Sequence, residues 1–276
     1  MKIVWATDLH LAFAGLQAIE QWYDSIRELH ADRLLITGDI SESTDLLFQL
    51  DRMLQSLQIP IDFVLGNHDY YQSSIRETRT KVRQHCRAIG KFHYLTGATP
   101  IELDFGWSLV GHDGWGDATL GNVDSTPIRL ADFESIRDFH GLSFAVRQER
   151  LRELGRDAAE TLKLSLQAVL RDGRHAMVLT HVPPFAEAMW YEGGHSDPDW
   201  LPYFACGAVG TILEELAEQY PHKKIFVLCG HTHHPGSVWM RPNLCVVTGG
   251  AEYGKPQTAG IWDTAYLEQS FPSPLP

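Results

Sequence analysis

The chain has 276 residues, of which 44% are hydrophobic and 21% charged. This balance is typical of a folded globular protein and excludes a largely disordered one. The net charge of −12, from 23 lysines and arginines against 35 aspartates and glutamates, argues against general nucleic-acid binding.

The four cysteines lie far apart and contain no CxxC pair, so they indicate buried, reduced thiols rather than a disulfide framework or a zinc ribbon. No apolar stretch approaches the roughly 20 residues of a membrane span. The apolar run at the start of the chain meets Asp8 too early for a signal peptide. We therefore expect a cytoplasmic protein that does not associate with membranes.

The first hundred residues alternate between short apolar runs and segments whose apolar residues have helical spacing. Strands are expected at Lys2–Ala6, 34–36 and 61–65, and helices at 17–29 and 44–57. Such alternation predicts right-handed crossover connections and a largely parallel sheet.

The second half of the chain has a different pattern. It predicts the following elements in order: a strand region at 101–110 with a turn at Gly106, an irregular polar segment at 117–140, a helix at 147–170, a strand at 176–179, a helix at 209–218, a strand at 225–228, and short antiparallel strands at 237–240 and 244–247. The chain is therefore expected to form two packed sheets with helices outside, an α/β sandwich in a single domain over residues 1–276.

Five predicted strands are each followed at once by side chains that can bind metals. These residues are Asp8 and His10, then Asp39, then Asn67-His68-Asp69, then His181, and finally His231 and His233. In open α/β sheets, ligands bind beyond the carboxyl ends of the strands. Each segment alone is compatible with an ordinary turn or a helix cap. Five in succession, each at a strand end, indicate a metal site.

In this order the segments resemble the motifs of the calcineurin-like metallophosphoesterases. The motifs are DLH at 8–10, GD at 38–39, GNHD at 66–69, His181, and GHTH at 230–233, and they span most of the chain. The resemblance implies the four-layer αββα sandwich of that family, with two mixed β-sheets flanked by helices. It also implies a binuclear metal centre.

Carried over motif by motif, the resemblance assigns Asp8, His10 and His233 to one metal ion. It assigns Asn67, His181 and His231 to the other, with Asp39 bridging the two. Nitrogen and oxygen donors without a thiolate suit Mn, Fe, Zn or Ni. Paired metal ions about 3.5–4 Å apart lower the pKa of a bridging water and neutralise phosphoryl oxygens. The expected reaction is attack of a metal-bridging hydroxide on phosphorus.

The resemblance also makes His68 the catalytic residue that protonates or stabilises the leaving oxygen. Family members often have an Asp three residues after the bridging Asp, and here Glu42 occupies that place. Glu42 is either an orienting partner of His68 or a solvated acid at a helix entry. Asp69 is expected to cap a helix or to form a supporting hydrogen bond. His234 is either a residue at the rim of the site or a part of it, and His112 is expected to have a structural or substrate-side role.

The predicted function is that of a metal-dependent phosphoester hydrolase, best matched by a phosphodiesterase acting on a small phosphorylated substrate. The residues after Gly38-Asp39 and the GNHD motif differ from the GDxVDRG and GNHE patterns of the Ser/Thr protein phosphatases. The alternatives are a small-molecule phosphomonoesterase, a nucleotide pyrophosphohydrolase and a non-enzymatic scaffold on the same fold. Two long segments, 111–140 and 183–207, either cover the metal site or pack their own aromatic side chains.

Overall fold

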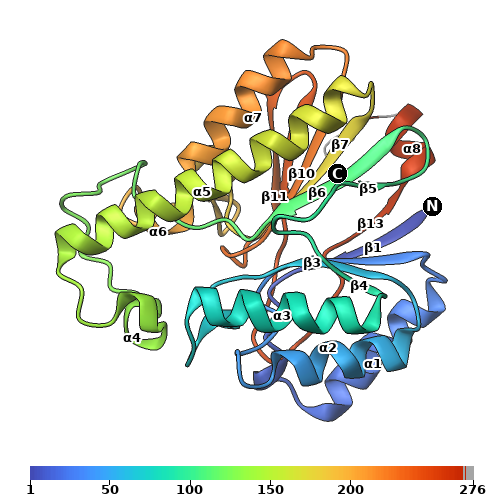
Figure 1. Cartoon of the computed structure of the whole chain (residues 1–276), viewed down its shortest axis with the longest axis horizontal. Coiled ribbons are helices and arrows are strands. Elements are labelled where there is room, and N and C mark those ends of the chain that lie inside the picture. Colours follow the sequence, from blue (N-terminus) through green and yellow to red (C-terminus); the bar gives the residue numbers. More distant parts are fainter. Residues whose placement is uncertain (270, 272–276) are drawn as a thin grey trace.

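The computed structural model describes residues 1–269 and 271, and two β-sheets form its centre (Figure 1). The first sheet has the strand order β13-β1-β2-β3-β4. Its strands are β1 (Lys2–Ala6), β2 (Arg33–Thr37), β3 (Ile61–Val64), β4 (Phe92–Tyr94) and β13 (Gly260–Asp263). Strands β1 to β4 are parallel, and β13 pairs antiparallel with β1.

Three helices connect the parallel strands of the first sheet and cover its outer face (Figure 1). They are α1 (Leu16–Glu28), α2 (Leu46–Leu57) and α3 (Ile75–Ile89). The helical spacing in the sequence predicts α1 and α2 to within two residues. It does not predict α3, whose charged sequence buries only Ile75, Thr78, Val82 and Cys86.

The second sheet has the strand order β11-β12-β10-β7-β6-β5. Its strands are β5 (Ile101–Glu102), β6 (Trp107–His112), β7 (His175–Thr180), β10 (Ile225–Cys229), β11 (Gly236–Arg241) and β12 (Leu244–Thr248). Strands β11 and β12 pair antiparallel with each other, as predicted, while β12 also pairs parallel with β10. Helices α5 (Phe144–Arg171) and α7 (Gly207–Gln219) cover the outer face of this sheet.

The inner faces of the two sheets pack against each other through large buried side chains, among them Trp5, Trp107 and Phe226. Two further apolar clusters lie between each sheet and its own helices. The layers therefore follow the order helix, sheet, sheet, helix (Figure 1), which is the predicted four-layer sandwich.

Two long connections carry the shorter elements. The first, after β6, contains α4 (Asp132–Ser135) and η3 (Arg137–Phe139); the second, after β7, contains η4 (Ala186–Ala188), β8 (Trp190–Tyr191), β9 (Gly194–His195) and α6 (Leu201–Phe204). The other short elements are η1 (Leu11–Phe13), η2 (His68–Tyr70) and α8 (Thr264–Gln269). The segment 117–140 is less polar in its contacts than its composition indicates, because Phe133, Ile136 and Phe139 join the core beside the first sheet.

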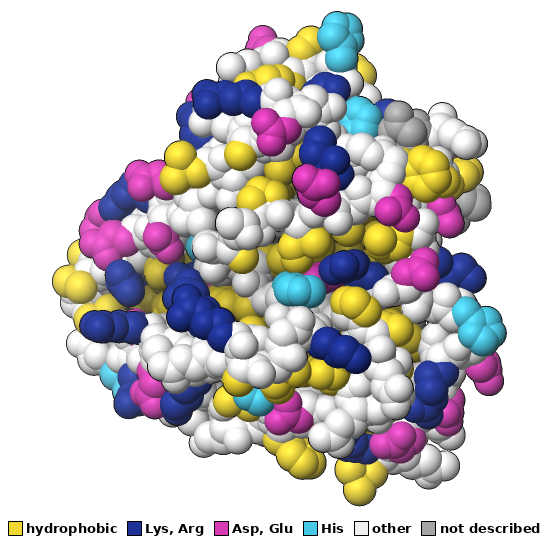
Figure 2. All heavy atoms as spheres, turned by 45° about the vertical axis from the view of Figure 1, so that its right-hand side comes forward, with side chains coloured by type: hydrophobic (Ala, Val, Ile, Leu, Met, Phe, Trp, Pro, Cys, Tyr) yellow, Lys and Arg dark blue, Asp and Glu magenta, His cyan; other side chains and the backbone are white. Residues whose placement is uncertain are grey.

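All four cysteines are buried and free of disulfides. Within residues 1–269 and 271, none of the helices combines the length and the apolar character needed to cross a bilayer. Figure 2 shows basic and acidic side chains interspersed over one face of the molecule.

Candidate metal centre

The seven predicted metal ligands come from both sheets and follow the carboxyl ends of parallel strands. Asp8 and His10 follow β1, Asp39 follows β2 and Asn67 follows β3, all in the first sheet; His181 follows β7, and His231 and His233 follow β10, in the second. The fold brings these seven side chains into two adjoining groups.

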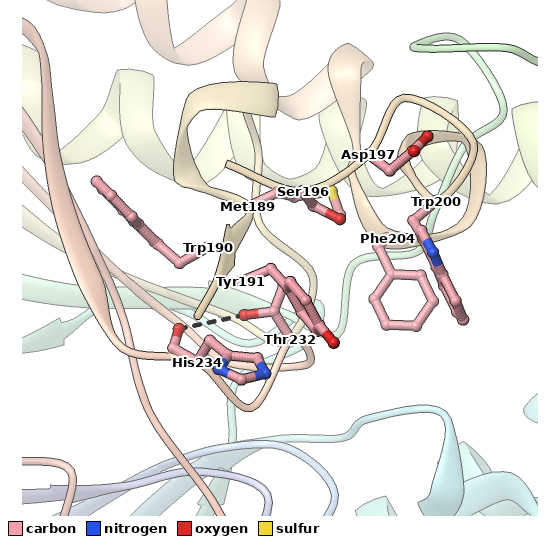
Figure 3. Close-up of a pocket in the computed structure, with 9 residues that line it drawn as sticks. All are labelled: Met189, Trp190, Tyr191, Ser196, Asp197, Trp200, Phe204, Thr232 and His234. Carbon is pink, nitrogen blue, oxygen red and sulfur yellow. Dashed lines mark hydrogen bonds between the residues drawn. The ribbon is translucent and has the colours of Figure 1, made fainter. Parts of the chain in front are cut away.

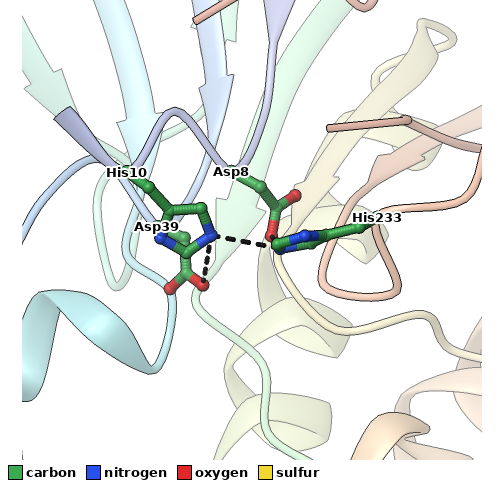
Figure 4. A group of neighbouring side chains, drawn as sticks. All are labelled: Asp8, His10, Asp39 and His233. Carbon is green, nitrogen blue, oxygen red and sulfur yellow. Dashed lines mark hydrogen bonds and ion pairs between the residues drawn. The ribbon is translucent and has the colours of Figure 1, made fainter. Parts of the chain in front are cut away.

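The first group consists of Asp8, His10, Asp39 and His233 (Figure 4). One ligand atom from each lies within 4.8 Å of the others. The Nε2 atoms of His10 and His233 are 3.1 Å apart, and Asp8 Oδ1 lies 3.4 Å from His233 Nε2. Burial lowers the pKa of His10 to about 3, so its imidazole is neutral and can offer a lone pair.

The second group consists of Asn67, His181 and His231. Asn67 Oδ1 lies 3.0 Å from His181 Nε2, which is 3.1 Å from His231 Nδ1. The other ring nitrogens face backbone carbonyls: His181 Nδ1 is 2.8 Å from the oxygen of Thr37, and His231 Nε2 is 3.3 Å from that of Tyr203. A carbonyl can only accept, so these two nitrogens carry the protons.

The protonation pattern leaves three acceptor atoms facing one another: Asn67 Oδ1, His181 Nε2 and His231 Nδ1. Burial, together with the neighbouring His181, holds the pKa of His231 well below its ordinary value. The His231 ring therefore carries a single proton, and Nδ1 has none to share with the other two acceptors. Lone pairs directed at a common point without a hydrogen between them repel, and a cation at that point relieves the repulsion. This donor set therefore fits a metal ion.

Asp39 lies between the two groups. Its Oδ2 is 3.7 Å from His10 Nε2, and its Oδ1 is 3.5 Å from His181 Nε2. Burial and the nearby carboxylates of Asp8 and Asp69 raise the pKa of Asp39 well above its usual range. Positive charge at the centre would offset this repulsion, so the carboxylate fits a bridge between two cations.

The backbone around the ligands is strained. In the described chain, eleven non-glycine residues have positive φ, and five of them are predicted ligands: Asp8, His10, Asp39, His231 and His233. A left-handed conformation costs a non-glycine residue about 1–2 kcal/mol. Such strain concentrates at functional sites, where it directs side chains that a regular strand would point elsewhere.

Close packing explains why glycine occupies these positions in the motifs. A Cβ atom at Gly66 would lie 2.2 Å from Asp39 Oδ1, and one at Gly230 would lie 2.1 Å from Asp8 Oδ2. Neither distance leaves room for a side chain. The backbones of the GNHD and GHTH segments therefore lie directly against carboxylates of the neighbouring segments.

Asp69 connects two ligand-bearing loops. Its Oδ1 accepts a hydrogen bond from the backbone N–H of Ser41 at 2.9 Å, and its Oδ2 accepts one from that of Gly66 at 2.8 Å. The side chain thus ties the segment after β2 to the segment after β3, the supporting contact expected from the sequence.

His68 lies at the edge of the first group. Its ring is 4.6 Å from that of His10 and stacks on Tyr71 at 4.3 Å, while its Nε2 is 3.3 Å from the hydroxyl of Tyr253. Burial, with the nearby His181, lowers the pKa of His68 to about 4. The backbone N–H of His68 donates to Asp39 Oδ1 at 2.8 Å, which links this residue to the bridging position.

Glu42 lies at the surface, where its Oε2 accepts a hydrogen bond from Gln72 Nε2 at 2.7 Å. Among the described residues, the contacts of the Glu42 carboxylate do not include His68. The role of Glu42 as an orienting partner stays a prediction.

Three residues that the motifs do not include also belong to the site: Asp132, Tyr71 and Tyr253. Asp132 Oδ1 accepts hydrogen bonds from Asn67 Nδ2 at 2.9 Å and from the Tyr71 hydroxyl at 2.7 Å. The ring of Tyr253 stacks on His10 with 4.2 Å between centroids. Asp132 lies in the connection after β6, and Tyr253 follows β12, in regions where no sequence pattern singles out one residue.

His112 ends β6, and Asp113, which follows it directly, has a structural role. The carboxylate of Asp113 is buried and accepts hydrogen bonds from Leu65 N (2.8 Å), Thr96 Oγ1 (2.7 Å), Tyr70 OH (2.6 Å), Tyr94 OH (2.6 Å) and Arg79 Nε (2.9 Å). Leu65 follows β3 of the first sheet and Asp113 follows β6 of the second. Asp113 therefore joins the two sheets close to the metal ligands.

A cavity of about 360 Å³ opens over the two groups. Asp39, Asn67, His68, His231 and His233 line it, together with Asp132 from the first long connection and Phe204 from the second. Both long connections thus border the metal centre.

Among solved structures, this chain resembles a phosphopantetheinyl hydrolase from Mycobacterium tuberculosis, with a TM-score of 0.64 and 15% identity over 93% of this chain and 95% of that one. It also resembles a dimetal phosphatase from Danio rerio, with a TM-score of 0.61 and 12% identity over 95% and 91%. At such identities the likeness shows a shared fold. A comparison with curated protein sequences finds no match.

A two-sheet sandwich that collects nitrogen and oxygen donors for two cations at the ends of its strands defines a binuclear metallohydrolase. Residues 1–235 match the model of the calcineurin-like phosphoesterase family. The chain therefore belongs to the calcineurin-like phosphoesterases. It is a hydrolase that uses two divalent metal ions.

Proposed function

We propose that this protein is a phosphodiesterase that acts on a small substrate. The observation that carries the proposal is the continuity of two cavities: Phe204, Thr232 and His234 line both the cavity over the metal centre and a second cavity beside it. A phosphodiester carries two substituents on one phosphorus. The second cavity offers room for one of them while the other extends toward His68 and Tyr253.

One ion would be held by Asp8, His10 and His233. The other would be held by Asn67, His181 and His231, and Asp39 would bind both ions. Two divalent cations bound there lower the pKa of a water and neutralise the charge on the phosphoryl oxygens. The histidine tautomers support this assignment for the second ion. The backbone carbonyls of Thr37 and Tyr203 keep the outward nitrogens of His181 and His231 protonated, so the inward nitrogens stay free to bind.

His68 would donate a hydrogen bond from its ring N–H to the leaving oxygen and so stabilise or protonate it. We assign the ring proton to Nε2, because Nδ1 is buried without a hydrogen-bond partner among the described residues, whereas Nε2 lies 3.3 Å from the hydroxyl of Tyr253, which lines the cavity. Stacking on Tyr71 fixes the plane of the imidazole, and Asp132 in turn fixes the hydroxyl of Tyr71. The acid–base step therefore rests on a side chain whose orientation is set before the substrate binds.

The proposal treats residues 1–276 as one domain in the cytoplasm. β13 lies beyond the matched residues 1–235 and completes the first sheet beside β1, which supports one folding unit. Four buried free thiols support a reducing compartment. The net charge of −12 and the interspersed surface charges (Figure 2) support a small phosphorylated substrate rather than a nucleic-acid chain.

The test compares turnover of bis-p-nitrophenyl phosphate and p-nitrophenyl phosphate. The protein is stripped of metal and reloaded separately with Mn²⁺, Zn²⁺, Ni²⁺ and Fe²⁺, with Asp39→Asn as the control. The proposal predicts metal-dependent turnover with a preference for the diester. A preference for the monoester would indicate a small-molecule phosphomonoesterase. An absence of turnover on both would point to a nucleotide pyrophosphohydrolase or a scaffold.

A further inference from the structure

A second cavity, of about 330 Å³, opens beside the metal centre, within the volume range of small-molecule sites (Figure 3). Four aromatic side chains line it: Trp190, Tyr191, Trp200 and Phe204. We propose that this aromatic cavity binds the heterocyclic base of a nucleotide whose phosphate lies at the metal centre. The inference rests on the proposed function and names the class of substrate.

Phe204 connects the cavity directly to the metal centre. Its ring stacks on that of His231, a predicted metal ligand, with 4.2 Å between centroids and 28° between planes. Trp200 meets Phe204 edge-on at 5.3 Å. A substrate whose phosphate lies beside His231 therefore reaches aromatic rings within about the length of one sugar.

The cavity presents aromatic faces to solvent. Trp200 is 40% exposed and Tyr191 is 54% exposed, although large apolar side chains are usually buried. Figure 3 shows Phe204 and Trp200 side by side, across from Tyr191 and His234. Tyr191 packs against His234 at 4.8 Å, so both walls are held by neighbouring rings. A flat ring entering between such walls can stack on them.

Polar groups at the edge of the cavity favour a base over an alkyl chain. Ser196 and Asp197 line the same space as the aromatic rings. One carboxylate oxygen of Asp197 accepts a hydrogen bond from the backbone N–H of Asp199 at 2.8 Å. A carboxylate can accept more than one hydrogen bond, and an N–H on a base is a suitable further donor. A saturated chain would gain burial from the rings but would leave these acceptors unused.

The test measures equilibrium binding to the Mn²⁺-loaded protein by calorimetry. Two probes are adenosine 5′-phosphonate and ribose 5-phosphonate, in which a methylene replaces the ester oxygen so that neither is hydrolysed. They differ only in the base. A third probe, octylphosphonate, carries an alkyl chain in its place.

We expect the adenosine compound to bind about 5- to 150-fold more tightly than the ribose compound, the range that stacking of a base on aromatic side chains gives. Trp200→Ala and Tyr191→Ala should each bring this ratio toward one. The matched control is Phe48→Ala, which removes an aromatic ring that is 63% exposed on α2, away from both cavities, and should keep the ratio. Binding of the ribose compound by each variant verifies that it is folded.

Equal affinities for the adenosine and ribose compounds would overturn the inference and leave the proposed function standing. So would a gain in affinity for octylphosphonate alone, or a ratio that Trp200→Ala and Tyr191→Ala both leave unchanged. If none of the three phosphonates bound the metal-loaded protein, the inference would be overturned, while turnover of the diester would decide the proposed function separately.

Discussion

Asp132 orients Asn67: its Oδ1 accepts a hydrogen bond from Asn67 Nδ2 at 2.9 Å, and the amide oxygen of Asn67 therefore faces His181. An amide left free to rotate could present either its oxygen, which binds cations, or its nitrogen, which does not. Asp132 is 5% exposed and also accepts a hydrogen bond from Tyr71. This one carboxylate thus supports both a predicted metal ligand and the ring that stacks on His68.

Asp132→Ala should weaken binding of the metal ion assigned to Asn67, His181 and His231. The expected loss is about 10- to 100-fold, the usual effect of removing a group that orients a ligand. Asp132→Asn keeps an acceptor oxygen and should restore most of the affinity. Calorimetric titration of the stripped protein with Mn²⁺ gives both values. Asp124→Ala, at an exposed acid in the same connection, is the control. If Asp132→Ala bound that ion like the native protein, Asn67 would not depend on Asp132.

Asp39→Asn should lower turnover to the level of the metal-free protein and weaken the binding of both ions. The carboxylate contributes one oxygen to each group of ligands, and a neutral amide lowers the negative charge that holds two cations together. Metal content by elemental analysis and turnover of bis-p-nitrophenyl phosphate are the readouts. Asp51→Asn, on α2, is a matched control. Substantial turnover by Asp39→Asn with full metal content would contradict the bridging assignment.

His68→Ala should reduce turnover by about 10²- to 10⁴-fold on an alkyl phosphodiester, whose leaving oxygen needs a proton. The reduction should be smaller on a p-nitrophenyl ester, because p-nitrophenolate leaves readily without one. Metal content should not change, since His68 is not among the predicted ligands. His140→Ala, at an exposed histidine, serves as the comparison. Full turnover of the alkyl diester by His68→Ala would remove His68 from the acid–base step.

Asp113→Asn should destabilise the fold by about 3–5 kcal/mol, the range for breaking a buried ion pair. The carboxylate accepts five hydrogen bonds, one of them from Arg79, and an amide cannot accept from all of those donors. Urea denaturation at pH 7 measures the free energy of unfolding. A variant as stable as the native protein would show that the contact between the sheets at Asp113 contributes little.

The same carboxylate predicts how stability changes with pH. Burial alone would raise the pKa of Asp113, but Arg79, His112 and the two tyrosine hydroxyls together lower it below its ordinary value. A group with a lowered folded-state pKa stabilises the fold above its unfolded pKa of about 3.9, and that contribution is lost as pH falls through the folded value. Urea midpoints measured below pH 4 should therefore fall less steeply for Asp113→Asn than for the native protein.

Much of the fold could be predicted from local patterns. The run Lys2–Ala6 is β1, and the helical spacing in 147–170 lies within α5. Helix α3 could not be predicted in this way, because only four of its residues are buried and the polar residues between them interrupt the apolar spacing. Strand β13 pairs with β1 across more than 250 residues, a long-range contact that leaves no trace in a local window.

The segments that carry the predicted ligands could be recognised because metal-binding side chains follow five predicted strands, and the resemblance to the family then assigned a place to each residue. The supporting residues could not. Tyr253 reaches His10 and His68 from the loop after β12, and its place depends on the packing of both sheets. Asp132 is one of several acids in its connection, and only the folded chain shows that it meets Asn67.

The most direct test of the account is a metal titration of the stripped protein, with bound Mn²⁺ and hydrolysis of bis-p-nitrophenyl phosphate followed in the same samples. The account predicts two ions bound per chain, with turnover appearing only as the second ion binds. Full turnover with one ion per chain, or turnover that persists in the metal-free protein, would contradict it.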